Sequence, residues 1–593
     1  MKFADGLDPY ILRQELLKNL FCPIVSLQST IHVDQFFQSL INDQNQSLST
    51  LQIFKPYGDN VKYSIPNQQF KITTTQLITK SYSSFPIRFE APITELIFMG
   101  NAQVKDSIKQ LFSISSLDHY LKQLKDGEND LYLILFDKII TSNYILAFDT
   151  FNHPIAQIFI IDKNKDSIED LRKMIVEFRN FNHFPKYFQI DDLMIHVFIL
   201  STDGDDNLFE FQNEIKLKLN VNSTILPIIF RNDDLLEVTI ENSTLESDVQ
   251  RMSMHNCSKS FKISNTIDQI LRIKINEFVL KWLLPHMQQQ IRIWDDQILQ
   301  PKKSITNKFL NFKKIFNNDT TTQITNEFNH VENYYYKSSS QQILRKLADW
   351  SLILRDFKYS YSIYDLIKKD YSSDKAWIYV SSTQEMCIIS LLLAQTQQLQ
   401  NLQTPDKNTL RKIRHDITEP YMDNLSYTYK SRFNLKTFNL RSLIIVSELL
   451  LCMSAQFKIS NWWNDLIEKY LINLKNEFDV HLGKDSIVKA ILLERLGYNT
   501  GKYMSISTTL KIENDEKMEE IEEGMYINHD KLEPTSKSIG MTKFRKSSLY
   551  YLLSSLQWEK LNKPIEIEKL KNNIIYQDTY LKDNLLINKL YSN

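Results

Sequence analysis

The runs IAQIFII at residues 155–161 and MIHVFIL at residues 194–200 are nearly uninterrupted apolar segments with the length of a buried β-strand. The stretch between them begins with Asp166 and Glu169, which have the spacing of a capping box. It continues with an apolar helical face made of Leu171, Met174, Ile175 and Phe178. Two buried strands joined by a helix indicate a parallel βαβ unit covered on both faces.

The same alternation continues on the C-terminal side. Phe209, Phe211, Ile215 and Leu219 predict another helix, and the segment 224–230 predicts a third strand. The first 85 residues belong to the same domain in this interpretation. We therefore expect an α/β domain with a mostly parallel sheet at residues 1–235, followed by a linker at 236–264.

From Asn265 the pattern changes to a helical period, which Pro285 should kink or break. Further on, a stripe at i, i+4, i+7 and i+11 is formed by Ile343, Leu347, Trp350 and Leu354. A later helix should begin near Asp374 with Trp377 and Val380 inside. The predicted fold class is an α/β N-terminal domain followed by an all-α helical-repeat, solenoid-like region. The predicted segments are a long helix plus a basic amphipathic helix (265–318), a mobile loop (319–340), the solenoid (341–505), an acidic loop (506–540) and C-terminal helices (541–593).

Composition excludes several classes of function. The chain has 593 residues, which is enough for about two to four domains. Its net charge of −1 gives the whole molecule no electrostatic attraction to nucleic acid. The ten glycines form neither GxGxxG nor a P-loop, so we expect no nucleotide cofactor. No signal peptide and no apolar run of about 20 residues is recognisable, which predicts a cytoplasmic protein.

Metal and catalytic patterns are weak. The four cysteines are isolated, and the histidines never occur at i, i+3 or i, i+4, so we expect neither a metal site nor a catalytic residue. We expect His153 to cap the backbone in a turn and His196 to be a core histidine. Four residues have the spacing of ligands in an EF-hand calcium loop: Asp203, Asp205, Asn207 and Glu214. The sixth position of such a loop requires glycine, which is absent here, so we interpret the segment as a polar strand-to-helix turn.

The strongest local signal is KKSITNKFLNFKKIF at residues 302–316. On a helix its four apolar residues fall within about 60° of one another, and lysines flank them. We predict that this segment binds membrane through Ile305, Lys308, Phe309, Phe312, Lys313, Lys314 and Phe316. The alternative is that the phenylalanines pack on the solenoid and the lysines are solvated. The residues alone favour neither.

Several segments together resemble the large subunit family that defines the TRAPP III form of the transport protein particle complex. The matching segments, in order, are FNHPI (151–155), LPHMQQQ (284–290) running into Trp294, ILQPKKS (298–304), RKLADWS (345–351), Leu443–Leu451, ERL (494–496) and FRK (544–546). None of them is a catalytic signature.

The resemblance implies a non-catalytic subunit that attaches to the small TRAPP core subunits and directs a Rab1-type GTPase exchange factor to membranes. In that family the exchange surface belongs to other subunits, and a membrane-inserting helix follows the ILQPKKS match. This implies contact of residues 305–316 with anionic membrane, and a peripheral location on Golgi and pre-autophagosomal membranes in autophagy and ER-to-Golgi traffic. Two alternatives stay open: a helical-repeat scaffold of another coat or tethering complex, and an enzyme hidden in the α/β half.

Overall fold

The computed structural model describes residues 8–40, 48–59, 68–98, 118, 121–122, 130–142, 144–202, 207–228, 234–239, 260–303, 328–397, 404–457, 460–481, 486–501 and 544–577. The chain divides into two compact units that alternate along the sequence. Unit 1 comprises Met1–Leu16, Lys109–Ile140 and Gln384–Asn593. Unit 2 comprises Leu17–Ile108 and Thr141–Thr383.

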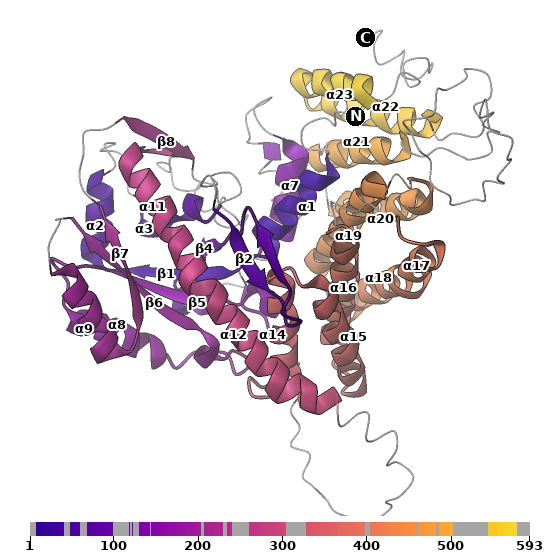
Figure 1. Cartoon of the computed structure of the whole chain (residues 1–593). Helices are drawn as coiled ribbons and strands as arrows, with labels where there is room; N and C mark the ends of the chain where they lie inside the picture. Colours follow the sequence, from indigo (N-terminus) through magenta and orange to yellow (C-terminus); the bar gives the residue numbers. More distant parts are fainter. Residues whose placement is uncertain are drawn as a thin grey trace, which may run out of the picture. The chain divides into compact units, whose positions relative to one another are not determined.

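Unit 2 is built around a five-stranded sheet in the order β4-β1-β5-β6-β7, in which every neighbouring pair is parallel (Figure 1). The two decisive apolar runs form its centre as β5 (Ala156–Asp162) and β6 (Met194–Ser201), in a register that places Ile160 beside Phe198. The predicted α/β class with a parallel sheet is confirmed. The outer strands are β1 (Ile24–Ser29), β4 (Arg88–Glu90) and β7 (Asn222–Pro227).

Alternate side chains of the central strands pack into two hydrophobic layers, one on each face of the sheet. Val197 and Ile199 face α8 (Ile168–Arg179) and α9 (Leu208–Leu219), together with Phe159 and Ile161 of β5. Phe198 faces the other way, where its ring contacts Phe54 of α3 (Thr50–Phe54) and Phe278 of α11 (Asn265–Phe278). The sheet is therefore covered on both faces, and its strands read as continuous apolar runs because both faces are buried.

The helix α8 begins one residue later than expected. Its capping box uses Ser167 and Asp170 instead of Asp166 and Glu169. Asp166 is occupied otherwise: one carboxylate oxygen accepts hydrogen bonds from Thr30 Oγ1 at 2.6 Å and from the Asp162 amide at 2.8 Å. Two residue pairs with capping-box spacing overlap here, Asp166 with Glu169 and Ser167 with Asp170. The predicted cap was wrong because Asp166 is already engaged in the contacts with Thr30 and the Asp162 amide.

Short strands occur in two segments for which we expected loops. The segment 236–264 contributes to an antiparallel pair of β8 (Leu235–Thr239) and β9 (Ser260–Ser264). The segment 319–340 contains the antiparallel pair β10 (Phe328–Asn329) and β11 (Tyr334–Tyr335). In β9, Phe261 and Ile263 are buried and Lys262 between them is exposed, which is the alternation of a β-strand. The strand was not predicted because it is short and lies in a mostly polar segment.

A long helical rod follows β9 (Figure 1). It consists of α11, the π-helical turn η5 (Val279–Leu283), α12 (Leu284–Trp294) and the π-helical turn η6 (Asp295–Leu299). The run does not end at Pro285, contrary to our expectation. Because η5 widens the helix immediately before the proline, the missing amide of Pro285 costs no regular i to i−4 hydrogen bond there.

The remaining helices of unit 2 are α14 (Ser340–Ile353), α15 (Phe357–Ser373) and the first part of α16 (Trp377–Gln395). Leu347 and Trp350 of the predicted stripe are buried, but so is nearly the whole second half of α14. Val380 is buried as predicted, whereas Trp377 stands at the first turn of α16 with 40% of its surface exposed. The prediction for Trp377 was wrong: it is the first residue of α16, where the helix has no preceding turn to cover the side chain.

Unit 1 is helical in its described parts, and its later helices pack on one another in chain order. These are α19 (Lys436–Phe457), α20 (Ser460–His481), α21 (Ile487–Gly501), α22 (Phe544–Lys560) and α23 (Pro564–Gln577). Two N-terminal helices, α1 (Pro9–Glu15) and α7 (Leu131–Ile140), pack on α19. Successive packing of neighbouring helices is the arrangement expected of a helical-repeat region.

Shorter elements complete the two units. In unit 1 they are α17 (Lys407–Arg411), η7 (Lys412–Thr418), α18 (Glu419–Tyr427) and η8 (Thr428–Arg432). In unit 2 they are α2 (Ile31–Leu40), η2 (Lys55–Gly58), β2 (Phe70–Thr73), β3 (Thr79–Tyr82), α4 (Ile93–Phe98), η3 (Thr150–Asn152) and η4 (Ile190–Asp192). The π-helical turn η1 (Leu16–Leu20) follows α1 directly.

Candidate functional site: the motif hub and the base of the basic segment

The residues predicted to bind membrane lie outside the described residues, which end at Lys303 and resume at Phe328. This applies to Ile305, Lys308, Phe309, Phe312, Lys313, Lys314 and Phe316. Asp203 and Asp205 of the partial EF-hand spacing also lie outside. The acidic segment 506–540 does as well.

The base of the basic segment is described and is fixed to α15. Lys302, the first lysine of that segment, forms an ion pair with Asp370 of α15. One turn of π-helix earlier, the Tyr359 hydroxyl donates a hydrogen bond to the Asp295 carboxylate. These two polar links attach the end of the long rod to a helix of the same unit.

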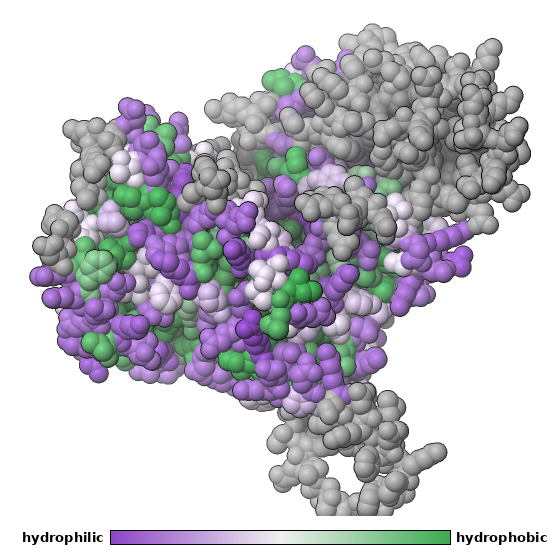
Figure 2. Space-filling view, in the orientation of Figure 1, coloured by the Kyte–Doolittle hydropathy of each residue, from purple (hydrophilic) through white to green (hydrophobic). Residues whose placement is uncertain are grey.

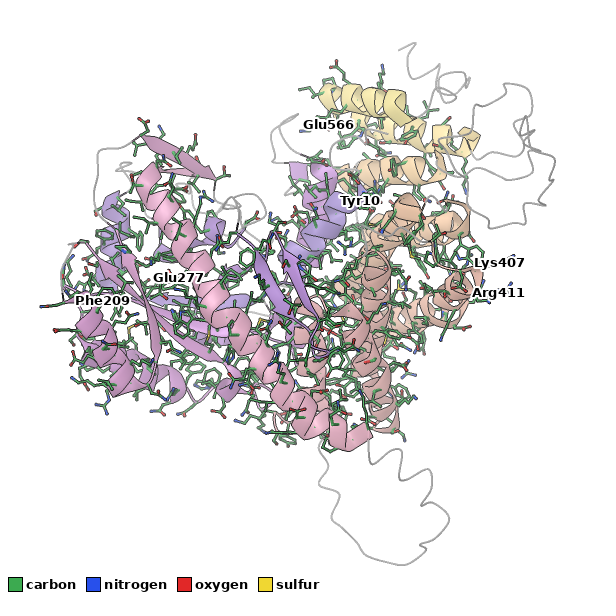
Figure 3. The ribbon with its side chains drawn as sticks, viewed as in Figure 1. Tyr10, Phe209, Glu277, Lys407, Arg411 and Glu566 are labelled. Carbon is green, nitrogen blue, oxygen red and sulfur yellow. The ribbon has the colours of Figure 1, made fainter. Side chains whose placement is uncertain are left out.

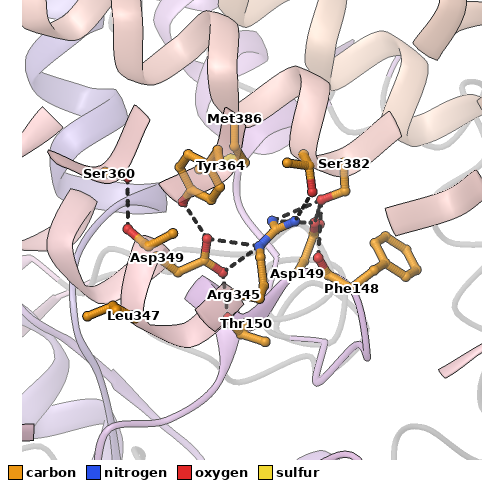
Figure 4. A network of polar contacts seen from close by, with 12 residues as sticks. Phe148, Asp149, Thr150, Arg345, Leu347, Asp349, Ser360, Tyr364, Ser382 and Met386 are labelled. Atoms are coloured by element: carbon orange, nitrogen blue, oxygen red, sulfur yellow. Dashed lines mark hydrogen bonds and ion pairs between the residues drawn. The ribbon is translucent and has the colours of Figure 1, made fainter. Parts of the chain in front are cut away.

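Three of the segments that carry the family resemblance, FNHPI, LPHMQQQ and RKLADWS, lie close to one another in unit 2 although they are scattered in sequence. The centre is Arg345 of RKLADWS, whose side chain is fully buried (Figure 4). Its Nε donates to Asp349 Oδ1 at 3.0 Å, and one guanidinium nitrogen donates to Ser382 Oγ at 2.9 Å. Asp149 lies 3.7 Å from the same nitrogen and accepts from Ser382 Oγ at 2.6 Å. We call this cluster the Arg345 network.

Asp349 closes the Arg345 network on its other side. It accepts a hydrogen bond from Thr150 Oγ1 at 2.5 Å and another from the Tyr364 hydroxyl. Burial alone would lower the pKa of Arg345, but the negative charges of Asp349 and Asp149 outweigh burial and hold that pKa above its usual value. The guanidinium therefore stays charged and connects the turn before FNHPI to three helices.

A second set of contacts joins RKLADWS to LPHMQQQ. The rings of Trp350 and Trp294 pack edge to face, with centroids 4.8 Å apart. His286 Nε2 lies 2.9 Å from the carbonyl oxygen of Asp192, and the Lys346 ammonium donates to the Asp192 carboxylate at 2.8 Å. Together with the Arg345 network, these contacts form the motif hub, which lies entirely within unit 2.

Both singled-out histidines are structural, as predicted. His153 Nε2 lies 2.6 Å from the Leu146 carbonyl oxygen, and burial lowers the pKa of His153 to about 3. His196 is buried between aromatic rings, with Nε2 2.9 Å from Thr224 Oγ1, and burial lowers the pKa of His196 to about 3. A neutral imidazole of this kind is not a general acid near neutral pH.

Unit 1 brings further matching segments together. Glu448, within Leu443–Leu451, accepts a hydrogen bond from Arg495 Nε of the ERL match at 3.0 Å and a second one from its terminal nitrogen. Tyr132 of α7 donates to the same carboxylate, and its ring lies 4.8 Å from the guanidinium carbon of Arg495. We call this cluster the Arg495 network. All three side chains are buried.

The edge of the sheet where α/β enzymes bind ligands is occupied by structural contacts. This edge, at the carboxyl ends of β1 and β5, is where the strand order reverses. There the buried Asp166 carboxylate is used by Thr30, the Asp162 amide and His32 Nδ1. Such a carboxylate caps backbone and has little capacity left for a ligand.

Three further observations bear on chemistry. Within the described residues, no group of three or more His, Cys, Asp or Glu side chains is arranged to hold a metal. Burial raises the pKa of Cys22 to about 11 and that of Cys452 to about 12, which leaves both as unreactive thiols near neutral pH. Two described helices are long and apolar enough to span a membrane, Trp377–Gln395 and Lys436–Phe457, but 89% of each apolar window is buried, as in a core helix.

Sequence comparisons identify the family to which this chain is similar. The family described as the ER-Golgi trafficking TRAPP I complex 85 kDa subunit matches residues 17–454. The trafficking protein particle complex III-specific subunit 85 of Saccharomyces cerevisiae is 27% identical over 420 residues, covering 62% of this chain and 57% of the yeast protein. The transport protein particle subunit trs85-1 of Schizosaccharomyces pombe is 22% identical over 396 residues, covering 58% of each chain.

The human trafficking protein particle complex subunit 8 is 29% identical over 125 residues, which is 21% of this chain and 9% of the human one. The chain thus spans little more than half the length of the yeast relatives. The family match includes the residues of the motif hub and extends through Glu448 of the Arg495 network. Because it covers well over half of the sequence, the chain belongs to the family of TRAPP complex 85 kDa subunits.

Proposed function

We propose that this protein is a non-catalytic subunit of a TRAPP III-type complex and that it places the complex on membranes. The observation that carries the proposal is the family match over residues 17–454, which includes the residues of the Arg345 network. In this proposal the partners are the small TRAPP core subunits, and the Rab1-type GTPase is engaged mostly through them. The sites of action are Golgi and pre-autophagosomal membranes, in autophagy and ER-to-Golgi traffic.

The attachment of the base of the basic segment to α15 supports a placement function. Asp295 and Lys302 attach the end of the long rod to α15, directly before the rest of the basic segment in sequence. A base that is fixed at Lys302, directly before four further lysines and three phenylalanines, is a suitable mount for a membrane contact. Burying three phenylalanines contributes about 1.5–3 kcal/mol each, and each lysine near anionic lipid adds about 1 kcal/mol, which gives reversible binding.

Subunit membership is tested by affinity purification of the tagged full chain, followed by mass spectrometry. We expect small TRAPP subunits in stoichiometric amounts. Recovery of subunits of another coat or tethering complex, without the small TRAPP subunits, would contradict the proposal.

Membrane binding is tested by flotation of the purified protein on anionic liposomes. We expect the triple variant Phe309→Asp, Phe312→Asp and Phe316→Asp to lose flotation. A matched control is Phe209→Asp, which changes an exposed phenylalanine of α9 that projects away from the ribbon (Figure 3). Equal flotation of wild type and the triple variant would exclude these phenylalanines as the membrane contact.

A further inference from the structure

The last turn of α15 holds the described chain on both sides of the basic segment. On the N-terminal side, Lys302 pairs with Asp370. On the C-terminal side, the Tyr335 hydroxyl of β11 donates a hydrogen bond to Asp374, one turn after Asp370, at 2.7 Å. Phe328, where the described chain resumes, packs on Tyr335 with ring centroids 4.7 Å apart. The described chain therefore stops and resumes at one place in unit 2, the end of α15 (Figure 1).

The short distance along the chain limits where a membrane bound by the basic segment can lie. Ile305, the first residue predicted to contact membrane, follows Lys303 by two residues. Even fully extended chain would separate their Cα atoms by at most about 7 Å. Lys302 is fixed to α15 one residue earlier. A membrane in contact with Ile305 therefore lies close to the end of α15, and exposed side chains at this end can reach it.

Two lysines at this end of α15 are exposed. Lys369 lies in the turn before the last, and Lys375 directly follows the C-cap residue Asp374. Within the described residues neither ammonium group forms an ion pair, whereas Asp370 and Asp374 are engaged with Lys302 and Tyr335. The charge of the two lysines is therefore available to an anionic surface.

The backbone at Lys375 has a conformation that glycine adopts more readily than lysine. Its φ angle is 56°, in the left-handed region. The Lys375 amide donates to the Ser372 carbonyl oxygen at 3.2 Å, and the Ala376 amide donates to the Tyr371 carbonyl oxygen at 2.9 Å, as in a Schellman helix end. Glycine is the usual residue at this position, so a lysine here adds a cation at a conformational cost. Strained positions of this kind concentrate at functional sites.

Trp377 distinguishes this surface from an ordinary helix end. Lysines near the C-terminus of a helix complement the helix dipole and need no further partner. The dipole does not account for a tryptophan with 40% of its surface exposed, two residues after Lys375. Tryptophan and lysine are both typical of the boundary between lipid headgroups and hydrocarbon. Figure 2 shows the visible described surface around the end of the rod as mostly hydrophilic, which suits contact with headgroups rather than deep insertion.

We propose that Lys369, Lys375 and Trp377 form a second membrane contact, which binds the headgroups of anionic lipids beside the basic segment. This inference rests on the proposed function, because the basic segment brings the membrane to this end of unit 2. The second contact adds charge and one aromatic side chain to the binding, and it fixes which end of unit 2 faces the membrane.

The first test titrates the purified full chain with vesicles of phosphatidylcholine and phosphatidylserine. The variant Lys369→Gln with Lys375→Gln should bind about 25-fold more weakly, since each lysine near anionic lipid contributes about fivefold. The matched control, Lys262→Gln with Lys216→Gln, changes exposed lysines of β9 and α9 and should bind like wild type. The long rod separates Lys262 from Lys302 by about 50 Å. Unchanged binding of the first variant would overturn the second contact.

The second test places a photo-crosslinking amino acid at position 377 and, as a control, at position 217, where Leu217 of α9 is 86% exposed. With the full chain bound to the same vesicles, we expect lipid adducts at 377 and none at 217. The same experiment on the purified complex identifies a protein that covers the site instead. Adducts at 377 only to another subunit, or no adduct at all, would contradict a membrane contact.

Failure of this inference is distinguishable from failure of the proposed function. If wild type does not float on anionic vesicles, both fail together. If wild type floats and the triple phenylalanine variant does not, the membrane role stands, and unchanged binding of the Lys369→Gln and Lys375→Gln variant overturns the second contact alone. The charge-preserving variant Lys369→Arg with Lys375→Arg should bind like wild type and melt at the same temperature. Loss of binding in that variant would contradict a contact based on charge.

Discussion

The Arg345 network of unit 2 and the Arg495 network of unit 1 both stabilise a buried arginine side chain, but with different sets of partners. Each buries an arginine completely inside a helical region. Arg345 is shared between two carboxylates, Asp349 and Asp149, and also reaches two hydroxyl groups of α16. Arg495 pairs with the Glu448 carboxylate, and its guanidinium lies 4.8 Å from the ring centroids of Tyr132 and Tyr498.

This difference determines how each network tolerates damage. A buried charge that loses its counter-ion is strongly destabilising, whereas one that keeps a second counter-ion is less affected. The Arg345 network connects an irregular turn to several helices, so several partners are needed to fix the turn. The Arg495 network connects regular helices that already pack along their length, and its ion pair with Glu448 is the contact closest to the guanidinium.

The largest expected effect is in unit 1. Glu448→Gln removes the counter-ion of Arg495 and should lower the free energy of unfolding of that unit by about 3–5 kcal/mol. Hydrogen exchange read by mass spectrometry measures this loss unit by unit. The double variant Glu448→Leu with Arg495→Met should recover most of the stability. No recovery would show that the network contributes more than the neutralisation of a buried charge.

Acidification should distinguish the two units next. His153 and His196 of unit 2 have folded pKa values of about 3, against about 6.5 in an unfolded chain. The unfolded state therefore binds more protons, and the stability that these groups contribute is full above about pH 6.5 and is lost as the pH falls toward 3. At pH 5 the loss is about 2 kcal/mol for each histidine. His196→Gln should flatten the pH dependence of unit 2 in exchange measurements, and an unchanged slope would contradict this account.

The smallest expected effect tests the redundancy of the Arg345 network. Asp149→Asn leaves Asp349 to neutralise Arg345 and should cost unit 2 about 1–2 kcal/mol, clearly less than Glu448→Gln costs unit 1. Parallel hydrogen-exchange measurements on the two variants compare them directly. Equal losses would mean that Asp349 alone does not compensate Arg345.

The parallel sheet could be predicted because its central strands are buried on both faces, and continuous apolar runs record that burial. The residue at which α8 begins, and the continuation of the helix through Pro285, could not be predicted from the sequence. Asp166 looks like a helix cap in sequence, but Thr30 and the Asp162 amide bind it in the structure. The π-helical turn before Pro285 has no recognisable sequence pattern.

The motif hub shows how little of the candidate site's geometry could be predicted from the sequence. RKLADWS and FNHPI were recognised as family segments, but no spacing rule places Arg345 beside Asp149, which are separated by nearly two hundred residues. A buried arginine is detectable in sequence only through its position within an otherwise apolar helical stripe.

The central claim is that this chain brings the TRAPP core to membrane through its basic segment. The most direct measurement is flotation of purified small TRAPP subunits with anionic liposomes, with and without the full chain. The account predicts that the core subunits float only when the wild-type chain is added, and not with the Phe309→Asp, Phe312→Asp and Phe316→Asp variant. Equal flotation without the chain, or none with the wild-type chain, would contradict it.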